Sequence, residues 1–300
     1  MGTRWVITGC RGQLGSALAA NLAGAEDCEV VAALDHAALD VGDPDAVKRF
    51  FDGLAAPPDV VVNAAAFTHV DRCEREPEVA HRVNAVAPVL LASACREARA
   101  RLVHVSTDYV FAGDAERPYT EADAPDPRSS YGRTKLEGEQ GVLAASDDFL
   151  VARTSWVYGR GRNFIASVLA QAEIRRREGS DEPLRVVDDQ RGRPTYAADL
   201  AAALRGLLER GGRGLYHLAN RGVATWWELA RACLNEVGFA DLEIERIRTE
   251  DLDLPAPRPA YSVLDCSKAE ALGVRTRDWR EAVRDYLRSE DSPLAGRGEV

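Results

Sequence analysis

Short apolar runs alternate with longer amphipathic segments through the first two thirds of the chain. The runs at 29–34 and 59–63 are apolar through their middles, which is typical of strands that are buried on both faces. Between the runs, leucine and alanine recur every three or four positions, and this spacing predicts helices. The predicted strands span 4–8, 29–34, 59–63, 101–106 and 149–153, and the predicted helices span 12–23, 43–54, 78–99 and 131–145.

The order of these elements predicts the architecture. Repeated strand–helix units imply a parallel sheet that carries helices on both faces. We therefore expect an α/β protein with a Rossmann-type, doubly wound parallel sheet, and we assign residues 1–155 to this first domain.

The pattern changes beyond about residue 155. We interpret residues 156–288 as a smaller C-terminal α/β domain, mainly substrate-binding and partly interleaved with the sheet. The proline-rich stretch 254–259 predicts a stiff extended connector, and the polar residues 289–300 predict a flexible tail. The helices predicted here lie near 162–177, 196–210 and 225–237, and the strands near 184–188, 215–218 and 243–247.

Composition and charge exclude several functional classes. The chain has 300 residues and a net charge of -10, whereas proteins that bind nucleic acid usually present a basic surface. No apolar run approaches the roughly 18 residues of a membrane span, and the first residues lack a signal-peptide layout. We therefore expect a cytoplasmic protein without nucleic-acid or membrane partners. The 6 cysteines are scattered without Cys-x-x-Cys pairs or cysteine–histidine clusters, so we expect free thiols and no metal site.

A glycine-rich turn follows the first predicted strand. Gly9, Gly12 and Gly15 form a Gly-x-x-Gly-x-x-Gly motif that opens the first predicted helix. This context suits a tight turn and close approach of the backbone to the pyrophosphate of a dinucleotide. The N–H groups at the helix N-terminus then face the phosphates. The motif predicts a nicotinamide dinucleotide site.

Acidic residues follow the second predicted strand. Asp35 lies about 20 residues after Gly15, where a carboxylate binds the adenosine ribose of NADH and repels a 2′-phosphate. Neighbouring arginine and histidine residues keep NADPH open as the cofactor. Asp40 and Val41 lie where a loop that contacts adenine is expected, although a turn that caps the next helix would explain them equally well.

Three residues suit the reduction of a carbonyl group. Tyr131 and Lys135 are four positions apart on a predicted helix and share one face, so the lysine charge can lower the pKa of the phenol. Thr107 ends a predicted strand at the edge of the sheet where ligands bind, and its hydroxyl can bond the same carbonyl. We predict Thr107, Tyr131 and Lys135 as the catalytic residues.

Longer stretches resemble the dTDP-4-dehydrorhamnose reductase family of extended short-chain dehydrogenase/reductases. The most specific are Ser-Thr-Asp-Tyr-Val-Phe at 106–111 and Arg-Thr-Ser-Trp-Val-Tyr at 153–158, and the resemblance covers nearly the whole chain. It implies a cofactor site formed by Gly12, Gln13, Leu14, Gly15, Asp35, Asp40, Val41, Ala65, Ala66, Phe67 and Lys135. It implies sugar contacts from Thr68, Asp108 and Trp156, together with Thr107 and Tyr131, and a nucleotide diphosphate held by arginines such as Arg193 or Arg258.

The resemblance implies reduction of a dTDP-linked 4-keto-6-deoxyhexose by NADH or NADPH, in a monomer or homodimer. The favoured reaction converts dTDP-4-dehydro-L-rhamnose to dTDP-L-rhamnose. Reduction of another dTDP-deoxysugar in antibiotic biosynthesis, or dTDP-dihydrostreptose synthesis, is an alternative within the same family. A non-catalytic, NADP-binding regulatory subunit is an alternative of a different class, and it would have no need of the proton donor.

Overall fold

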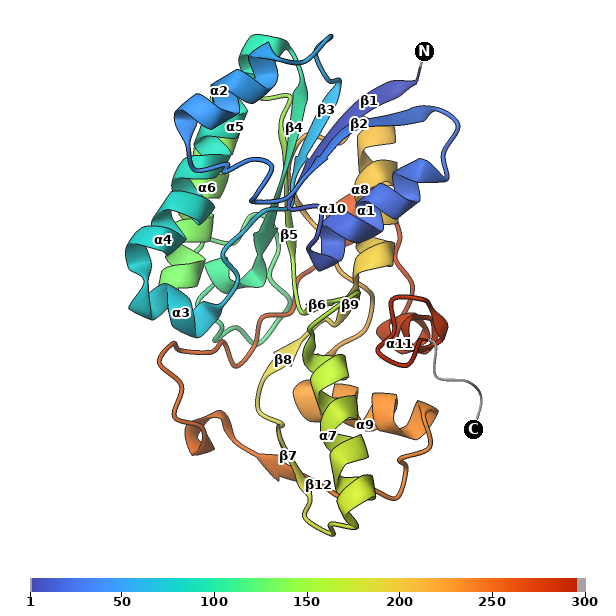
Figure 1. The fold of residues 1–300 in the computed structure, drawn as a ribbon. Coiled ribbons are helices and arrows are strands. Elements are labelled where there is room, and N and C mark those ends of the chain that lie inside the picture. The colour runs from blue at the N-terminus through green and yellow to red at the C-terminus, as the bar shows by residue number, and fades with distance from the viewer. Residues whose placement is uncertain (1, 296–300) are drawn as a thin grey trace.

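A six-stranded parallel sheet forms the centre of the computed structural model, which describes residues 2–295 (Figure 1). Every neighbouring pair of strands in this sheet is parallel. The predicted α/β fold with a Rossmann-type parallel sheet is therefore confirmed. The strands, in spatial order, are β10 (Gly214–His217), β5 (Leu150–Thr154), β4 (Arg101–Thr107), β3 (Val60–Asn63), β1 (Thr3–Thr8) and β2 (Cys28–Leu34).

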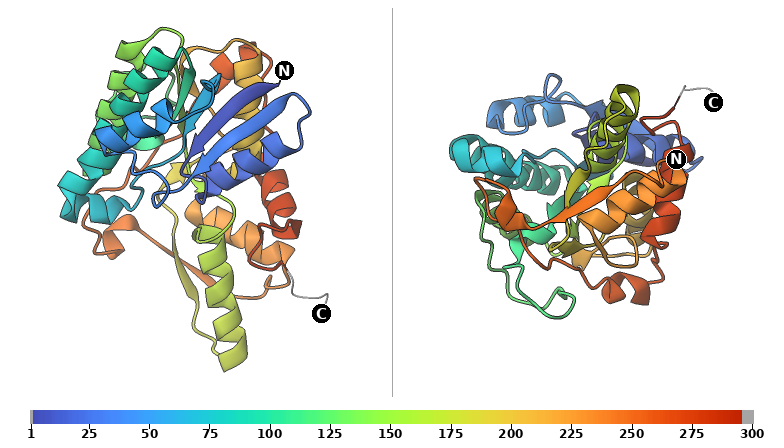
Figure 2. Two further views of the ribbon diagram at one scale, coloured as in Figure 1. Left: turned by 45° about the horizontal axis from the view of Figure 1, so that its top comes forward. Right: turned by 90° about the horizontal axis from the view of Figure 1, so that it is seen from below.

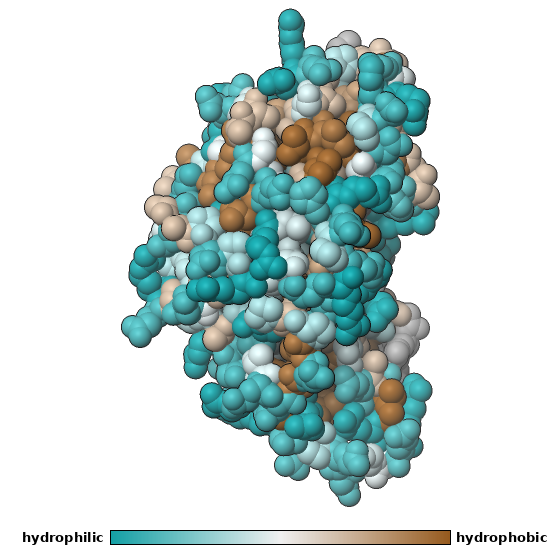
Figure 3. Space-filling model, turned by 90° about the vertical axis from the view of Figure 1, so that its left-hand side faces the viewer, coloured by the Kyte–Doolittle hydropathy of each residue, from teal (hydrophilic) through white to brown (hydrophobic). Residues whose placement is uncertain are grey.

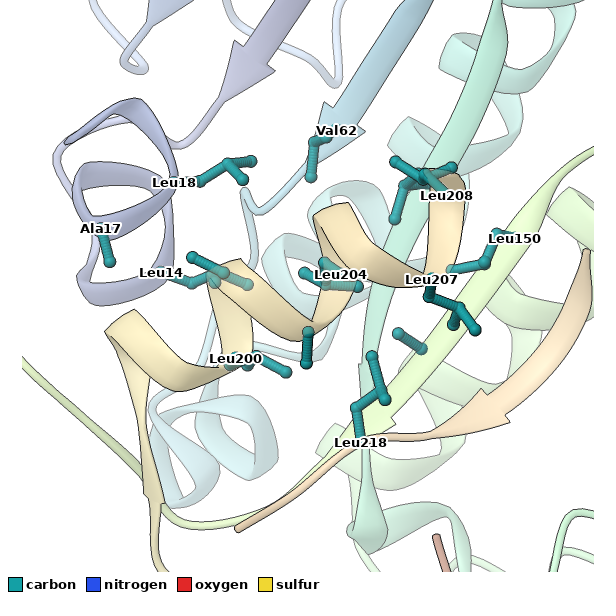
Figure 4. Close-up of a cluster of buried hydrophobic side chains, with 14 of the residues drawn as sticks. Leu14, Ala17, Leu18, Val62, Leu150, Leu200, Leu204, Leu207, Leu208 and Leu218 are labelled. Carbon is teal, nitrogen blue, oxygen red and sulfur yellow. The ribbon is translucent and has the colours of Figure 1, made fainter. Parts of the chain in front are cut away.

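Helices cover both faces of the sheet because each presents an apolar stripe to it. On one face lie α1 (Gln13–Ala23), α8 (Ala197–Glu209) and α10 (Ser267–Ala271), and on the other lie α2 (Pro44–Asp52), α5 (Ala87–Ala98) and α6 (Ser130–Ala145) (Figure 1). Figure 4 shows Leu18 of α1 facing Val62 of the sheet, and Leu207 and Leu208 of α8 beside Leu150. Burial of these side chains stabilises the layer by roughly 1.5–3 kcal/mol each.

The helix predicted at 78–99 is divided in the structure. It consists of α4 (Pro77–His81), the π-helical turn η1 (Arg82–Val86) and α5. In a regular α-helix the N–H of residue 88 would bond the carbonyl of Asn84, but Pro88 has no N–H to donate. Asn84 instead bonds the backbone N–H and C=O of Phe67 through its side chain, at 2.8 and 3.1 Å. The π turn therefore ties the segment after β3 to the helix layer.

The second domain lies beyond the carboxyl ends of the central strands. Its helices α7 (Phe164–Glu178), α9 (Trp226–Glu236) and α11 (Trp279–Arg288) are grouped below the sheet in Figure 1, and the left-hand view of Figure 2 shows the same group. Its own core packs α7 and α9 against a two-stranded parallel ladder of β7 and β12. There are two smaller pairs: β6, which follows β5 in the chain, pairs with β9, and β8 pairs with β11. The elements are β6 (Val157–Tyr158), α7 (Phe164–Glu178), β7 (Leu184–Val187), β8 (Arg191–Gly192), β9 (Thr195–Tyr196), β11 (Ala224–Thr225), α9 (Trp226–Glu236), β12 (Ile244–Ile247) and the turn η3 (Thr249–Asp251).

Three further helices were not predicted from the sequence pattern. They are α3 (Val70–Arg75), α10 and α11 (Trp279–Arg288), and the last buries Trp279 and Tyr286 in the second core although half of its residues are charged. Residues 289–295 of the expected flexible tail continue this packing, because Asp291 pairs with Arg160 and Leu294 lies against the second core. The rest of the expected tail, 296–300, lies outside the described residues.

The outer face of the first domain is mostly polar. Figure 3 looks at this face and shows apolar side chains gathered in patches among hydrophilic ones. A shallow groove of about 400 Å³ lies between α2 and α5, where Phe51, Leu54 and Leu90 line it. Within residues 2–295, no helix is long and apolar enough to cross a membrane.

Candidate active site

A cavity of about 780 Å³ lies at the carboxyl ends of the central strands, between the sheet and the second domain. Ligands of open α/β sheets bind at this edge because the loops that follow parallel strands converge there. The structure brings ten of the predicted site residues to its wall. They are Gly12, Gln13, Leu14, Ala66, Thr68, Thr107, Asp108, Tyr131, Lys135 and Trp156.

The glycine turn between β1 and α1 forms one wall and admits no larger residues at two positions. Gly9 has a φ of +71°, and a Cβ on it would lie 2.7 Å from the backbone of Ala65. A Cβ on Gly15 would lie 2.2 Å from the carbonyl oxygen of Gly9. Gly12 is the N-cap of α1 and has no side chain to bond the first N–H groups of the helix. This bare helix start is a suitable cradle for a pyrophosphate.

Replacement of Gly15 by alanine should weaken cofactor binding. The new Cβ meets backbone on the opposite side of the turn, so the turn itself must move. Overpacking of this kind costs about 1–3 kcal/mol, which corresponds to a roughly 5- to 150-fold rise in the Kd of NADH or NADPH. Fluorescence titration measures the change. Gly24→Ala, at the other end of α1 where a Cβ has its nearest neighbour at 3.8 Å, should bind as the unchanged protein does.

The remaining predicted cofactor residues do not line the cavity. Asp35, directly after β2, pairs with Arg11 at 2.8 Å, and Arg11 does line the cavity. Asp40 accepts from Arg82 at 2.7 Å; burial acts to raise the pKa of this carboxyl, but hydrogen bonds from Arg82 and the Gly42 N–H lower it overall. The structure places Gly9, Gly15, Asp35, Asp40, Val41, Ala65 and Phe67 outside the cavity wall, so their cofactor roles stay predictions.

Tyr131 and Thr107 meet at the centre of the cavity. Tyr131 lies in the first turn of α6, and its ring packs edge-on against Tyr109 with centroids 5.5 Å apart. Burial raises the pKa of Tyr131 well above its ordinary value, and a hydrogen bond with Thr107 counteracts part of this rise. The phenol therefore stays protonated in the cofactor-free protein. It is placed to give a proton to an oxygen atom in the cavity.

Asp108 is held by two hydroxyl groups. Thr107 donates to one carboxylate oxygen at 3.0 Å, and Ser262 donates to the other. Burial raises the pKa of Asp108 to about 6 despite these two bonds. Asp108 therefore orients Thr107 directly, and the resemblance had implied only a sugar contact for it.

Lys135 is fully buried on the same face of α6 as Tyr131. Its Nζ donates to the carbonyl oxygen of Val105 at 2.6 Å and lies 3.2 Å from Nε2 of His104. Burial lowers the pKa of Lys135 to about 8. An ammonium that is less stable than usual releases its proton easily, which suits a group that exchanges protons near neutral pH.

One side of the cavity is aromatic. Trp156 has a φ of 48°, an unusual value for a residue other than glycine, and stacks on Trp226 with ring centroids 3.6 Å apart. Gly192 lies beneath it, since a Cβ there would sit 2.5 Å from the indole. Arg193, predicted to bind substrate, points elsewhere: its Nη1 contacts Sγ of Cys266, and it does not line the cavity.

A second, mostly apolar cavity of about 300 Å³ adjoins the first through Tyr109 and Trp226. It lies between α7 and the ladder of β7 and β12, and Arg258 lies on its wall. Arg258 pairs with Asp71 of α3 at 2.7 Å, so one ion pair links the two domains beside the site. Sequence reasoning missed Tyr109, although it stands in the Ser-Thr-Asp-Tyr motif, and it missed Trp226, which no local pattern marks.

The chain is similar to known proteins over nearly its whole length. The family model described as "RmlD substrate binding domain" matches residues 3–292. A dTDP-4-dehydrorhamnose reductase of Mycolicibacterium smegmatis is 44% identical over 96% of this chain and 86% of its own length. A probable dTDP-4,6-dihydroxy-2-methyloxan-3-one 4-ketoreductase of Streptomyces antibioticus is 44% identical over 97% of this chain and 98% of its own. The structure of the Bacillus anthracis dTDP-4-dehydrorhamnose reductase in complex with NADP has a TM-score of 0.87 and 32% identity, covering 96% of this chain and 99% of that one.

Proposed function

The chain belongs to the RmlD substrate binding domain family, which includes dTDP-4-dehydrorhamnose reductases, and we propose that it uses NADH or NADPH to reduce the C4 ketone of a dTDP-4-keto-6-deoxyhexose. The favoured reaction converts dTDP-4-dehydro-L-rhamnose to dTDP-L-rhamnose. The observation that carries the proposal is the meeting of Thr107, Tyr131 and Lys135 in one cavity with the glycine turn. The cofactor supplies hydride to C4, and the chain supplies the proton and the binding groups.

The reaction requires a protonated acid beside the ketone oxygen. Tyr131 is protonated and gives its proton to that oxygen. The Thr107 hydroxyl at the end of β4, which donates to Asp108 in the cofactor-free protein, turns to donate to the same oxygen. A charged Lys135 stabilises the tyrosinate that remains, because opposite charges favour each other strongly in a buried site. Hydrogen-bond donors aimed at the developing negative charge lower the barrier without reorganisation.

The two connected cavities suit the two ends of a nucleotide sugar. We assign the larger cavity to the sugar and the cofactor, and the apolar one to the nucleoside, with the diphosphate between them. Arg258 stands at this junction, held by Asp71, and would bind the diphosphate. Arg193 lines neither cavity, so we do not assign it this role.

Replacement of Gly192 by alanine should raise the KM for the sugar more than it lowers kcat. The new Cβ displaces the Trp156 indole, which stacking on Trp226 prevents from shifting freely. The expected rise in KM is about 5- to 150-fold, since overpacking costs about 1–3 kcal/mol. Steady-state kinetics separates the two parameters. Gly206→Ala in α8 should behave as the unchanged enzyme, and an equal KM in both variants would argue against a sugar contact from Trp156.

The proposal is tested by NADH and NADPH oxidation with enzymatically generated dTDP-4-dehydro-L-rhamnose, with the product identified by NMR. Formation of dTDP-L-rhamnose supports the proposal and ranks the two cofactors. Turnover of a different dTDP-4-keto sugar alone would favour the alternative that the Streptomyces antibioticus relative represents. Cofactor binding without turnover of any keto sugar would point to a non-catalytic subunit.

A further inference from the structure

A chain of buried polar groups runs inward from Lys135. His104, in the middle of β4, is fully buried and lies between Lys135 of α6 and Asn63 at the end of β3. Asn63 in turn accepts a hydrogen bond from the hydroxyl of Thr8 at 2.8 Å. Neither the catalytic residues nor the cofactor turn requires a histidine at this place. A buried histidine between two polar side chains must present a defined tautomer to each of them.

The orientation of Asn63 follows from its neighbours. The backbone N–H of Ala65 lies 3.2 Å from Oδ1 of Asn63, and a backbone N–H can only donate. The oxygen of the amide must therefore face Ala65, so its Nδ2 faces Nδ1 of His104, at 3.1 Å. Because Nδ2 of Asn63 donates, Nδ1 of His104 must accept and carries no proton.

The tautomer of His104 then determines what Lys135 must be. Burial holds the pKa of His104 well below its ordinary value, so the ring is neutral. Its one proton lies on Nε2 and points at Nζ of Lys135, 3.2 Å away. Only an uncharged amine has a lone pair that can accept this hydrogen bond, and the same amine still donates to the carbonyl of Val105.

We propose that His104 is a positioning residue for Lys135: as the Nε2–H tautomer it favours the uncharged form of Lys135 in the cofactor-free protein, and the charge of Lys135 and the tautomer of His104 change together. A charged Lys135 would donate to Nε2, which would move the ring proton to Nδ1 against the amino group of Asn63. The hydrogen bonds of His104 and Asn63, which lie beneath α6, therefore disfavour a positive charge on Lys135.

The other charged groups around Lys135 do not remove this constraint. Glu139, one turn further along α6, favours the charged lysine, but both of its carboxylate oxygens are engaged by Arg153 of β5. Burial already lowers the pKa of Lys135 to about 8, and the hydrogen bond from His104 acts in the same direction. The next step rests on the proposed function. Hydroxyl groups of the cofactor replace His104 as the partner of Lys135, and Lys135 then gains its charge. Cofactor binding therefore takes up a proton at alkaline pH.

Nuclear magnetic resonance of the cofactor-free protein tests the proposal without any turnover. The lysines of the chain are Lys48, Lys135 and Lys268, so spectra of lysine-labelled protein are simple, and Lys48→Arg and Lys268→Arg variants assign Lys135. We expect Lys135 to titrate at or below about 8, and the ¹⁵N signals of His104 to change from the Nε2–H to the Nδ1–H pattern in the same pH range. The proposal would be overturned if Lys135 titrates near 10.5, or if the tautomer of His104 stays the same while Lys135 titrates.

Two variants separate the two ends of the imidazole. His104→Gln places an amide oxygen near the former position of Nε2, where it accepts a hydrogen bond from a charged lysine. His104→Asn keeps a partner for Asn63 but removes the donor to Lys135. In both we expect the pKa of Lys135 to rise from about 8 toward 10.5. His217→Gln is the matched control, because His217 is equally buried but its imidazole forms hydrogen bonds only with the backbone carbonyls of Tyr119 and Asp265. An unchanged pKa of Lys135 in both His104 variants would contradict the proposal.

The kinetic counterpart is the pH profile of kcat/KM for the cofactor, which reports on the free enzyme. Activity requires charged Lys135, so kcat/KM falls as pH rises through the pKa of Lys135. In His104→Gln this fall should move to higher pH. If His104 had a purely structural role, its replacement would lower activity at every pH and would not shift the pH at which activity falls. If no keto sugar is reduced, the proposed function fails, and the magnetic resonance titration still decides the role of His104.

Discussion

Tyr131→Phe is expected to lower kcat for ketone reduction by about 10²- to 10⁴-fold, the usual contribution of a positioned general acid. The phenylalanine ring fills the same space against Tyr109, so binding of the sugar and the cofactor should change little. The loss arises because the ketone oxygen then has no proton donor beside Thr107. Single-turnover measurement of cofactor oxidation gives the rate of the chemical step, and fluorescence titration gives the affinity for the cofactor.

Tyr158→Phe is the matched control for this variant. Tyr158 is buried in the core of the second domain, stacks on Tyr196, and its hydroxyl has no hydrogen-bond partner among the described residues. Removal of an unpaired buried hydroxyl should be nearly neutral for stability and should leave kcat unchanged. Comparable kcat values in Tyr131→Phe and Tyr158→Phe would remove Tyr131 from the proposed mechanism.

The largest expected loss of stability comes from the ion pair beneath the catalytic helix. Arg153 of β5 bonds Glu139 of α6 through Nε and Nη2, at 3.0 and 2.7 Å, and both side chains are almost completely buried. Glu139→Ala leaves the guanidinium buried without its partner. We expect this to lower the free energy of unfolding by about 3–5 kcal/mol, measured by chemical denaturation.

The double variant Glu139→Leu with Arg153→Met shows whether the cost comes from the charge left unpaired. Apolar residues of similar size remove both charges together, and such exchanges are often neutral or stabilising. We expect the double variant to recover most of the stability that Glu139→Ala loses, although Arg153 also gives up its packing over the ring of Phe111. A single variant that costs less than about 1 kcal/mol, the range of exposed pairs, would show that water reaches this pair.

The ion pair and the polar chain through His104 lie under the same stretch of α6. Lys135 and Glu139 are one turn apart, and they face β4 and β5 respectively. The catalytic helix is therefore attached to the sheet by buried polar bonds as well as by apolar packing. Such bonds fix one position of the helix, since any displacement leaves buried donors unpaired.

Local sequence was sufficient for most of the fold. The apolar runs that predict β1 to β5 are read from adjacent residues, and so is the glycine turn before α1. Two local signals were available but were not used. A histidine interrupts the apolar strand at His104, and Tyr109 lies inside the motif that contains Thr107. Both turned out to border the catalytic residues.

The sequence by itself determined the order and type of the central elements and the glycine turn, and it supplied the proposed catalytic trio. These depend on backbone propensity, hydrophobic period and fixed spacing, which act over a few residues. Only the tertiary structure decided that Arg193 turns toward Cys266, that Trp226 supports Trp156, and that His104 lies between Lys135 and Asn63. Each of these contacts joins residues far apart along the chain, and it exists only because the strands and helices pack in one register. The close-packed interior, rather than any local preference, selects the side-chain positions that set the charge and shape of the site.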